Sequence, residues 1–207
     1  MSLRLRALHK MSALFLGLFL AAHIGNHLYG IGGQQAHMNY TANARVIYRN
    51  SIVEPLLLTL IAWQAGSGLI LLWRSRLSKR SVVGWLQQLS GLYLAIFLLI
   101  HVAAVISGRM VYGLDTDFRF AAAGFHVGNF SLFFAPYYFL AVLSLFAHVG
   151  CALYWNLTSL TLPTRKSILG ILIVIGAISS LLVVMSLAGM FYEVDIPAAY
   201  RGTYDLF

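Results

Sequence analysis

The chain has 207 residues, of which 60% are hydrophobic and only 10% are charged. Because soluble domains contain about 25% charged residues, this composition excludes a water-soluble globule and indicates a protein whose solvent is lipid. The net charge of +8 does not indicate nucleic acid binding, since the cations flank apolar runs rather than forming a basic patch interleaved with aromatic residues.

Five apolar runs are each long enough to cross a hydrocarbon core of about 30 Å. The last is the clearest, because no charged residue occurs between Ile168 and Tyr192. We therefore predict an all-α integral membrane bundle of five transmembrane helices, forming a single domain over residues 1–207. In chain order the predicted spans lie at about 11–31, 52–73, 82–106, 132–155 and 168–192.

The first run also has the features of a secretory signal peptide, with LAA as a cleavage site. We favour a retained helix, because the sequence continues as HIGNHLYG with no soluble domain behind it. Cys151 is the only cysteine, which excludes a disulfide framework and a CxxCH haem attachment.

The cations are distributed unequally between the two sides of the predicted bundle. With a cytoplasmic N-terminus, the inner segments hold nine of the 14 cations: Arg4, Arg6, Lys10, Arg74, Arg76, Lys79, Arg80, Arg165 and Lys166. The outer segments hold Arg45, Arg49, Arg109, Arg119 and Arg201, and the six acids (Glu54, Asp115, Asp117, Glu193, Asp195, Asp205) lie outside or at the outer edge. The positive-inside rule thus predicts a multi-pass protein of the cell (inner or plasma) membrane, with a cytoplasmic N-terminus and an external C-terminus.

The seven histidines fall into two groups. His9 lies at the inner interface and His37 and His126 lie in outer loops, so we expect these three to be interfacial or surface residues. The others, His23, His27, His101 and His148, lie within apolar runs, where an ionisable group is costly and faces the bundle interior with a partner. A single membrane histidine usually bonds a carbonyl or hydroxyl of a neighbouring helix. Several at one depth indicate a cofactor.

Two of these histidines share a depth. At about 1.5 Å per residue, His23 lies about 20 Å and His101 about 24 Å from the inner face, on spans that run in the same direction. Two imidazoles at one level can bind both axial positions of one haem iron. His27, one turn after His23 on the same face, is an alternative ligand or a partner for a haem propionate.

His148 lies in the inner half, about 10 Å from the inner interface. The position at its level in the second span is Gln64, a poor iron ligand, and no histidine occurs between Ile52 and Trp73. Three arrangements stay open: one haem only, with His148 bonded to Gln64 or another polar group; a five-coordinate inner haem on His148; or quinone in that space. We favour the first.

The same residues carry a resemblance to a known family. The chain resembles the five-helix, type B cytochrome b membrane anchor of succinate dehydrogenase and fumarate reductase. The similar segments span nearly the whole chain: ALHKMSALFLGLFLAAH, WQAGSG, LQQLSGLYLAIFLLIH, LSLFAHVGCALYW and LPTRKS. In that family an outer haem b takes histidines from helices 1 and 3, at positions matched here by His23 and His101. An inner haem takes them from helices 2 and 4, matched by Gln64 and His148. Gln88 also departs from the pattern, which often has an arginine there.

The resemblance implies the partners. They are an iron–sulfur subunit and a flavoprotein subunit on the cytoplasmic face, with membrane quinone as substrate and haem b as the electron carrier. The chain would then be a subunit of an oxidoreductase without an active site for succinate itself.

Glu54 is a candidate for quinone-linked proton transfer near the outer haem, because it is the acid that adjoins an apolar span on its N-terminal side. The alternative, which we weigh ahead of it, is a carboxylate that stabilises the first helical turn, before Pro55.

Other functions stay open at this stage. They are a cytochrome b anchor of a hydrogenase or formate dehydrogenase, a non-redox transporter with polar histidines in its pathway, and a structural scaffold without cofactor. A transporter commonly shows inverted repeats and broken helices, and neither is detectable in this sequence.

Overall fold

The computed structural model describes residues 2–75 and 81–204. These residues form helices and connecting loops without a strand, which confirms the predicted all-α class. Four charged residues of the orientation argument lie outside the described residues: Arg76, Lys79, Arg80 and Asp205.

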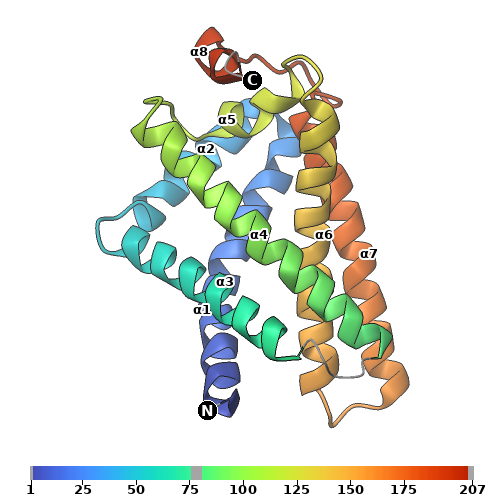
Figure 1. Ribbon diagram of the computed structural model, residues 1–207. Helices are drawn as coiled ribbons and strands as arrows, with labels where there is room; N and C mark the ends of the chain where they lie inside the picture. Colours follow the sequence, from blue (N-terminus) through green and yellow to red (C-terminus); the bar gives the residue numbers. More distant parts are fainter. Residues whose placement is uncertain (1, 76–80, 205–207) are drawn as a thin grey trace.

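Five of the described helices are long and apolar enough to cross a membrane, so the chain is a multi-pass membrane bundle as predicted. They are α1 (Ser2–Tyr29), α3 (Val53–Ser75), α4 (Val82–Met110), α6 (Ser131–Asn156) and α7 (Leu162–Leu187). The shorter elements are η1 (Gly30–Gly32), α2 (Gln34–Tyr48), α5 (Phe118–Ala122), η2 (Ala123–Phe125), α8 (Ala198–Arg201) and η3 (Gly202–Tyr204). They gather toward the end where the C-terminus lies, while the N-terminus lies at the opposite end (Figure 1).

The structure shifts the last predicted span, 168–192, toward the N-terminus. Thr161 caps the start of α7 by accepting a hydrogen bond from the Thr164 amide at 3.4 Å, and Pro163 suits the first turn. Beyond the other end, Gly189 has a φ of 73°, a left-handed conformation that stops a helix. Capping chemistry therefore sets these ends, whereas hydropathy alone extends the span to Tyr192.

The predicted outer loop after the first span contains the helix α2. Its buried residues are His37 and Thr41, one turn apart, so this face points into the protein. The expectation of a surface loop histidine at position 37 is wrong, since His37 is only 3% exposed. The buried residues on the inner face of α2, His37 and Thr41, are polar, so hydropathy does not reveal that this face is buried.

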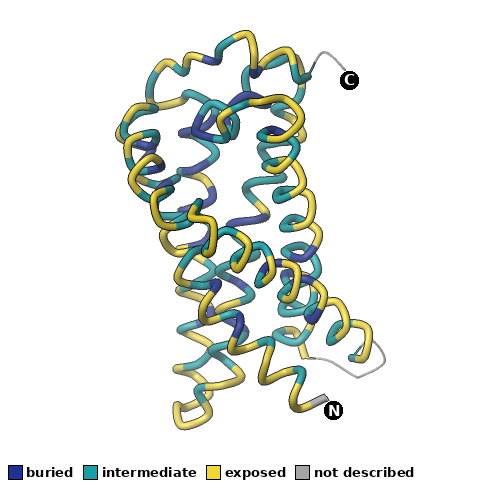
Figure 2. Tube along the Cα trace, turned by 90° about the vertical axis from the view of Figure 1, so that its left-hand side faces the viewer, coloured by how far each residue is buried: buried dark blue, intermediate teal, exposed yellow. Residues whose placement is uncertain are grey.

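The main cluster of buried apolar side chains lies at the end of the bundle rather than in its middle. It comprises Phe118, Ala122, Ala123, Val183, Leu187, Ile196 and Tyr200, and we call it the end cap. Along the long helices, by contrast, many of the buried residues are small, such as Ser67, Ala95 and Gly150. Buried positions accordingly form short patches on these helices (Figure 2). The end cap therefore fixes the helix ends, while the middle is left to small residues and histidines.

The helices α6 and α7 lie side by side along their lengths (Figure 1). Glycine allows this approach, because a Cβ added to Gly176 would lie 2.6 Å from the Cβ of Phe146. Likewise a Cβ on Gly150 would lie 2.8 Å from a methyl carbon of Leu169. Small residues at helix crossings serve this purpose in membranes, where van der Waals packing holds helices together.

The substitution Gly176→Ala is therefore expected to destabilise the bundle by about 1–3 kcal/mol, the range for overpacking a well-filled contact. The matched control is Gly170→Ala on the same helix, where the added Cβ meets nothing within 4 Å. Thermal unfolding of both variants in the same detergent measures the difference. Equal unfolding temperatures would show that the contact between α6 and α7 is not tight at Gly176.

Candidate functional site

Four histidines from three helices lie next to one another in the half of the bundle nearer the C-terminus. His23 and His27 come from α1, His37 from α2 and His101 from α4. The ring centroids are 6.1 Å apart for His23–His101, 4.9 Å for His23–His27 and 5.0 Å for His27–His37. We call these four residues the histidine cluster. The structure thus brings His23 and His101 to one level, as the residue counting predicts, and adds His37.

Aromatic rings one turn earlier on each helix hold the two central imidazoles. Phe19 stacks on His23 with ring centroids 5.6 Å apart, and Phe97 stacks on His101 with centroids 5.2 Å apart and an interplanar angle of 13°. Both contacts follow from i, i+4 spacing on a helix. The stacking restricts the ring orientations and keeps the surroundings apolar.

Histidines elsewhere in the bundle satisfy their ring nitrogens within the protein. His148 donates from Nδ1 to the carbonyl of Gln87 at 3.1 Å and lies 3.3 Å from the Ser90 hydroxyl. His126 donates from Nε2 to the carbonyl of Leu187 at 2.9 Å. These residues have the ordinary structural role of a membrane histidine, bonding a neighbouring helix or loop.

In the histidine cluster, His23, His27 and His101 differ from His126 and His148. Among the described residues, His23, His27 and His101 make no hydrogen bond, and the buried Nδ1 of His27 has no partner. Nε2 of His37 also has no hydrogen-bond partner among the described residues, while its Nδ1 lies 3.3 Å from the Thr41 hydroxyl. Since buried polar groups are normally bonded, the unpartnered buried nitrogens of His27 and His37 make this region a candidate for ligand binding.

The spacing of the central pair suits two axial ligands of one metal. Two imidazoles that each bind a shared ion at about 2.0–2.1 Å, on opposite sides, place their ring centroids about 6 Å apart, and His23 and His101 are 6.1 Å apart. Within residues 2–75 and 81–204, no group of three or more histidine, cysteine or acidic side chains is arranged to hold a metal ion. Two imidazoles are the number of protein ligands that a bis-histidine haem iron takes.

The rim of the cluster carries buried donors. Arg45, on α2, binds Asp115 through Nη1 at 2.8 Å, yet its buried Nε and Nη2 have no hydrogen-bond partner in the part of the chain that the structure describes. Burial alone would raise the pKa of the Asp115 carboxyl, but Arg45 and Arg49 hold it below its usual value. A small cavity of about 30 Å³ lies between α1 and α2, where His23 and Tyr48 are among its lining residues. The donors of Arg45 suit a carboxylate ligand.

Burial lowers the pKa of His37 to about 4, with a further contribution from the neighbouring His23. Asp117 acts in the opposite direction and Arg45 in the same direction as burial. His37 is therefore neutral at pH 7, with one ring nitrogen free to accept a hydrogen bond or a proton.

Stability is expected to fall as the pH drops from about 6.5 to about 4. Unfolded chains protonate His37 near its ordinary pKa of 6.5, whereas the folded protein resists protonation until about pH 4. The contribution of His37 to the free energy of unfolding is thus fully present above pH 6.5 and is lost on acidification, by up to about 3 kcal/mol. Unfolding temperatures of the wild-type chain and of His37→Gln, measured across this pH range, test it. Toward pH 4 the wild-type chain should lose stability relative to His37→Gln. A difference in unfolding temperature that stays constant across the pH range would contradict the assignment.

The level of the bundle that holds His9, Gln64 and His148, which we call the inner layer, differs from the histidine cluster. Gln64 does not bond His148; its Nε2 lies 3.1 Å from Nε2 of His9, and its Oε1 accepts from Ser12 at 2.6 Å. His9 also contacts Ser67, at 2.7 Å through Nδ1. His148 packs instead on Gly91 of α4, where an added Cβ would lie 2.9 Å from its ring. Sequence reasoning thus missed the bonded role of His9, for which the one signal is Ser12, three residues later and so on the same face of α1.

Glu54 lies at the second position of α3, and its carboxylate forms an ion pair with Arg109 near the end of α4. This pairing joins two helices that are adjacent in sequence, and Arg109 is the partner that sequence reasoning missed.

Comparisons of the chain with family models, with curated proteins and with solved structures found no match.

Proposed function

We propose that this chain is a membrane cytochrome that holds one haem b between His23 and His101. It would transfer electrons between membrane quinone and an iron–sulfur subunit docked on the cytoplasmic face, with a flavoprotein subunit behind it. One observation carries the proposal: two imidazoles on different transmembrane helices, without hydrogen bonds among the described residues, have ring centroids 6.1 Å apart. The resemblance of the sequence to type B succinate dehydrogenase anchors supports the same function.

The roles of the residues follow from their contacts. His23 and His101 would bind the iron, while Phe19 and Phe97 fix the planes of their rings. Arg45, whose buried Nε and Nη2 have no hydrogen-bond partner among the described residues, is one candidate to bind the haem propionates, and His27 is the other. When bound, haem b supplies a one-electron carrier whose potential depends on its ligands and its burial.

The chain contributes surroundings that suit electron transfer. One apolar aromatic ring stacks on each imidazole, Phe19 on His23 and Phe97 on His101. The transfer of two electrons and two protons converts a quinone to a quinol, and the reverse process returns them. On this proposal the N-terminal end, which carries Arg4, Arg6 and Lys10, faces the cytoplasm and the docked subunits.

A visible absorption spectrum of the chain purified from its own membranes tests the proposal. We expect a sharp Soret band with split α and β bands on reduction, as low-spin haem gives. A preparation without haem bands contradicts the proposal and favours a transporter or scaffold. The co-purifying soluble subunit then identifies the complex: succinate oxidation by the partner supports the proposed one, and hydrogen or formate oxidation supports another respiratory oxidoreductase.

A further inference from the structure

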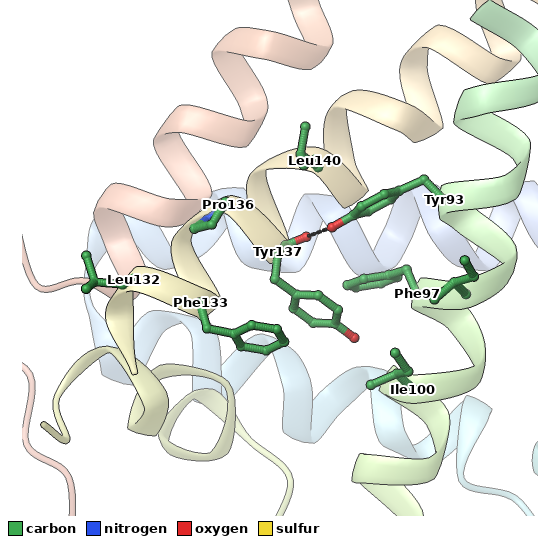
Figure 3. A pocket seen from close by; sticks show the side chains of 9 residues that line it. Tyr93, Phe97, Ile100, Leu132, Phe133, Pro136, Tyr137 and Leu140 are labelled. Atoms are coloured by element: carbon green, nitrogen blue, oxygen red, sulfur yellow. Dashed lines mark hydrogen bonds between the residues drawn. The ribbon is translucent and has the colours of Figure 1, made fainter. Parts of the chain in front are cut away.

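A pocket of about 350 Å³ lies between α4 and α6 (Figure 3). Aromatic and aliphatic side chains line it almost entirely. They are Tyr93, Ile96, Phe97, Ile100, Leu132, Phe133, Pro136, Tyr137 and Leu140. Several of them are exposed on the outside of transmembrane helices, including Ile100 at 50% and Phe133 at 56%. The pocket therefore opens to the hydrocarbon core, and its occupant must be soluble in lipid.

The wall of this pocket contains an unused hydrogen-bond donor. The buried hydroxyl of Tyr137 has no partner among the described residues, whereas the hydroxyl of Tyr93 donates to the Tyr137 carbonyl at 2.9 Å. The ring of Tyr137 lies between Phe133 and Phe97, with its hydroxyl on the side of Ile100 (Figure 3). An unpaired hydroxyl in an apolar surrounding is unfavourable by about 1–3 kcal/mol. A ligand with an acceptor oxygen would remove that penalty.

A second polar group comes from the backbone. Pro136 lies inside α6 and has no N–H, so the carbonyl of Leu132 lacks its usual helical donor. The pocket lining thus includes Leu132, the residue whose carbonyl has lost its helical donor, and Tyr137, whose hydroxyl has no partner among the described residues. A ring oxygen that is a carbonyl in one state and a hydroxyl in the other can accept from such a hydroxyl and donate to such a carbonyl.

The pocket also adjoins the histidine cluster. Phe97 lines the pocket, lies 4.7 Å from the Tyr137 ring, and stacks at 5.2 Å on His101. A planar molecule in the pocket would therefore be separated from a proposed haem ligand by one aromatic ring. Short separation through packed atoms favours electron exchange between the two.

We propose that this pocket binds the head group of the membrane quinone, with the Tyr137 hydroxyl donating a hydrogen bond to one quinone carbonyl. The flat head group packs against the aromatic side chains that line the pocket, and the isoprenoid tail leaves toward lipid past Ile100. Phe133 is more than half exposed, so its ring can turn aside to admit the ligand. A lipid acyl chain fits the apolar lining less well, because it offers no acceptor to Tyr137. The choice of quinone as the ligand rests on the proposed function. The pocket assignment places this quinone between α4 and α6 instead of beside Glu54.

Photolabelling with an azido-quinone tests the site in the chain's own membranes. We expect crosslinks on the α4 and α6 segments that line the pocket, and competition by excess unmodified quinone. Crosslinks at the start of α3 near Glu54, or labelling that fatty acid displaces as well as quinone does, would overturn the proposal. A haem spectrum of the same preparation keeps the two proposals apart: with normal haem bands and labelling elsewhere, the pocket assignment fails alone.

Two pairs of variants sharpen the test. Tyr137→Phe removes only the donor and should weaken quinone competition about five- to tenfold, the effect of one hydrogen bond. Its matched control is Tyr138→Phe, a tyrosine on the same helix that packs against the end cap. Ile100→Trp fills the pocket and should abolish labelling, whereas Ile106→Trp, on α4 outside the pocket lining, should leave it unchanged. Equal labelling in Ile100→Trp and wild type would overturn the proposal, and a normal haem spectrum in each variant shows that it has folded.

Discussion

Replacement of His101 by alanine is expected to abolish the low-spin haem spectrum of the purified chain and to lower its haem content by more than about tenfold. The His101 imidazole makes no hydrogen bond among the described residues, so its removal breaks no polar contact within the protein. A bis-imidazole iron that loses one axial ligand becomes five-coordinate and high-spin. Reduced-minus-oxidised spectra and a pyridine haemochrome assay measure both effects.

A rescue experiment separates ligation from folding. In His101→Gly, added imidazole can occupy the space of the lost side chain and should restore the low-spin bands. His148→Ala is the matched control, because His148 lies on another transmembrane helix and is bonded to the Gln87 carbonyl. An unchanged spectrum and haem content in His101→Ala would show that His101 is not an iron ligand.

One haem per chain is the second expected result. The inner layer holds His148 and His9, and both are already bonded within the protein: Nδ1 of His148 to the Gln87 carbonyl, and His9 to Ser67 and Gln64. Gln64, the residue at the matching level of α3, bonds His9 and Ser12 instead. A low-spin inner haem needs two imidazoles at one level, and α3 contains no histidine.

The ratio of haem to protein, together with electron paramagnetic resonance of the oxidised chain, tests this expectation. We expect a ratio of one and a single low-spin species, which His148→Ala leaves in place. Two low-spin species at a ratio of two would mean that His148 finds an imidazole partner, and His9 on α1 is the remaining histidine on that side of the membrane.

Much of the fold follows from hydropathy, and the central pair of histidines follows from counting residues. His23 and His101 share a level because α1 and α4 run in the same direction and rise by a fixed length per residue. His37 could not be placed in this way, since its depth depends on how the short helix α2 folds back against α1. The number of transmembrane helices is a property of composition, whereas the position of α2 is a property of packing.

The partners of the polar side chains were equally hidden from the sequence. His148 bonds a backbone carbonyl, and every residue carries one, so nothing in the pattern marks Gln87 as its acceptor. Glu54 and Arg109 meet only because α3 and α4 place the start of one helix near the end of the other (Figure 1). The quinone pocket likewise depends on the crossing of α4 and α6, which no short motif encodes.

The end cap has a consequence for how the protein is assembled in the membrane. Its buried residues come from three distant parts of the chain: Phe118 before α6, Leu187 at the end of α7, and Tyr200 after it. During synthesis the first two helical hairpins are therefore inserted before the cap can form. Only when α7 has crossed the bilayer and delivered Ile196 and Tyr200 to the far side does the cap close over Phe118. Helix insertion and bundle closure are thus separate events, and the last transmembrane crossing is the step that joins them.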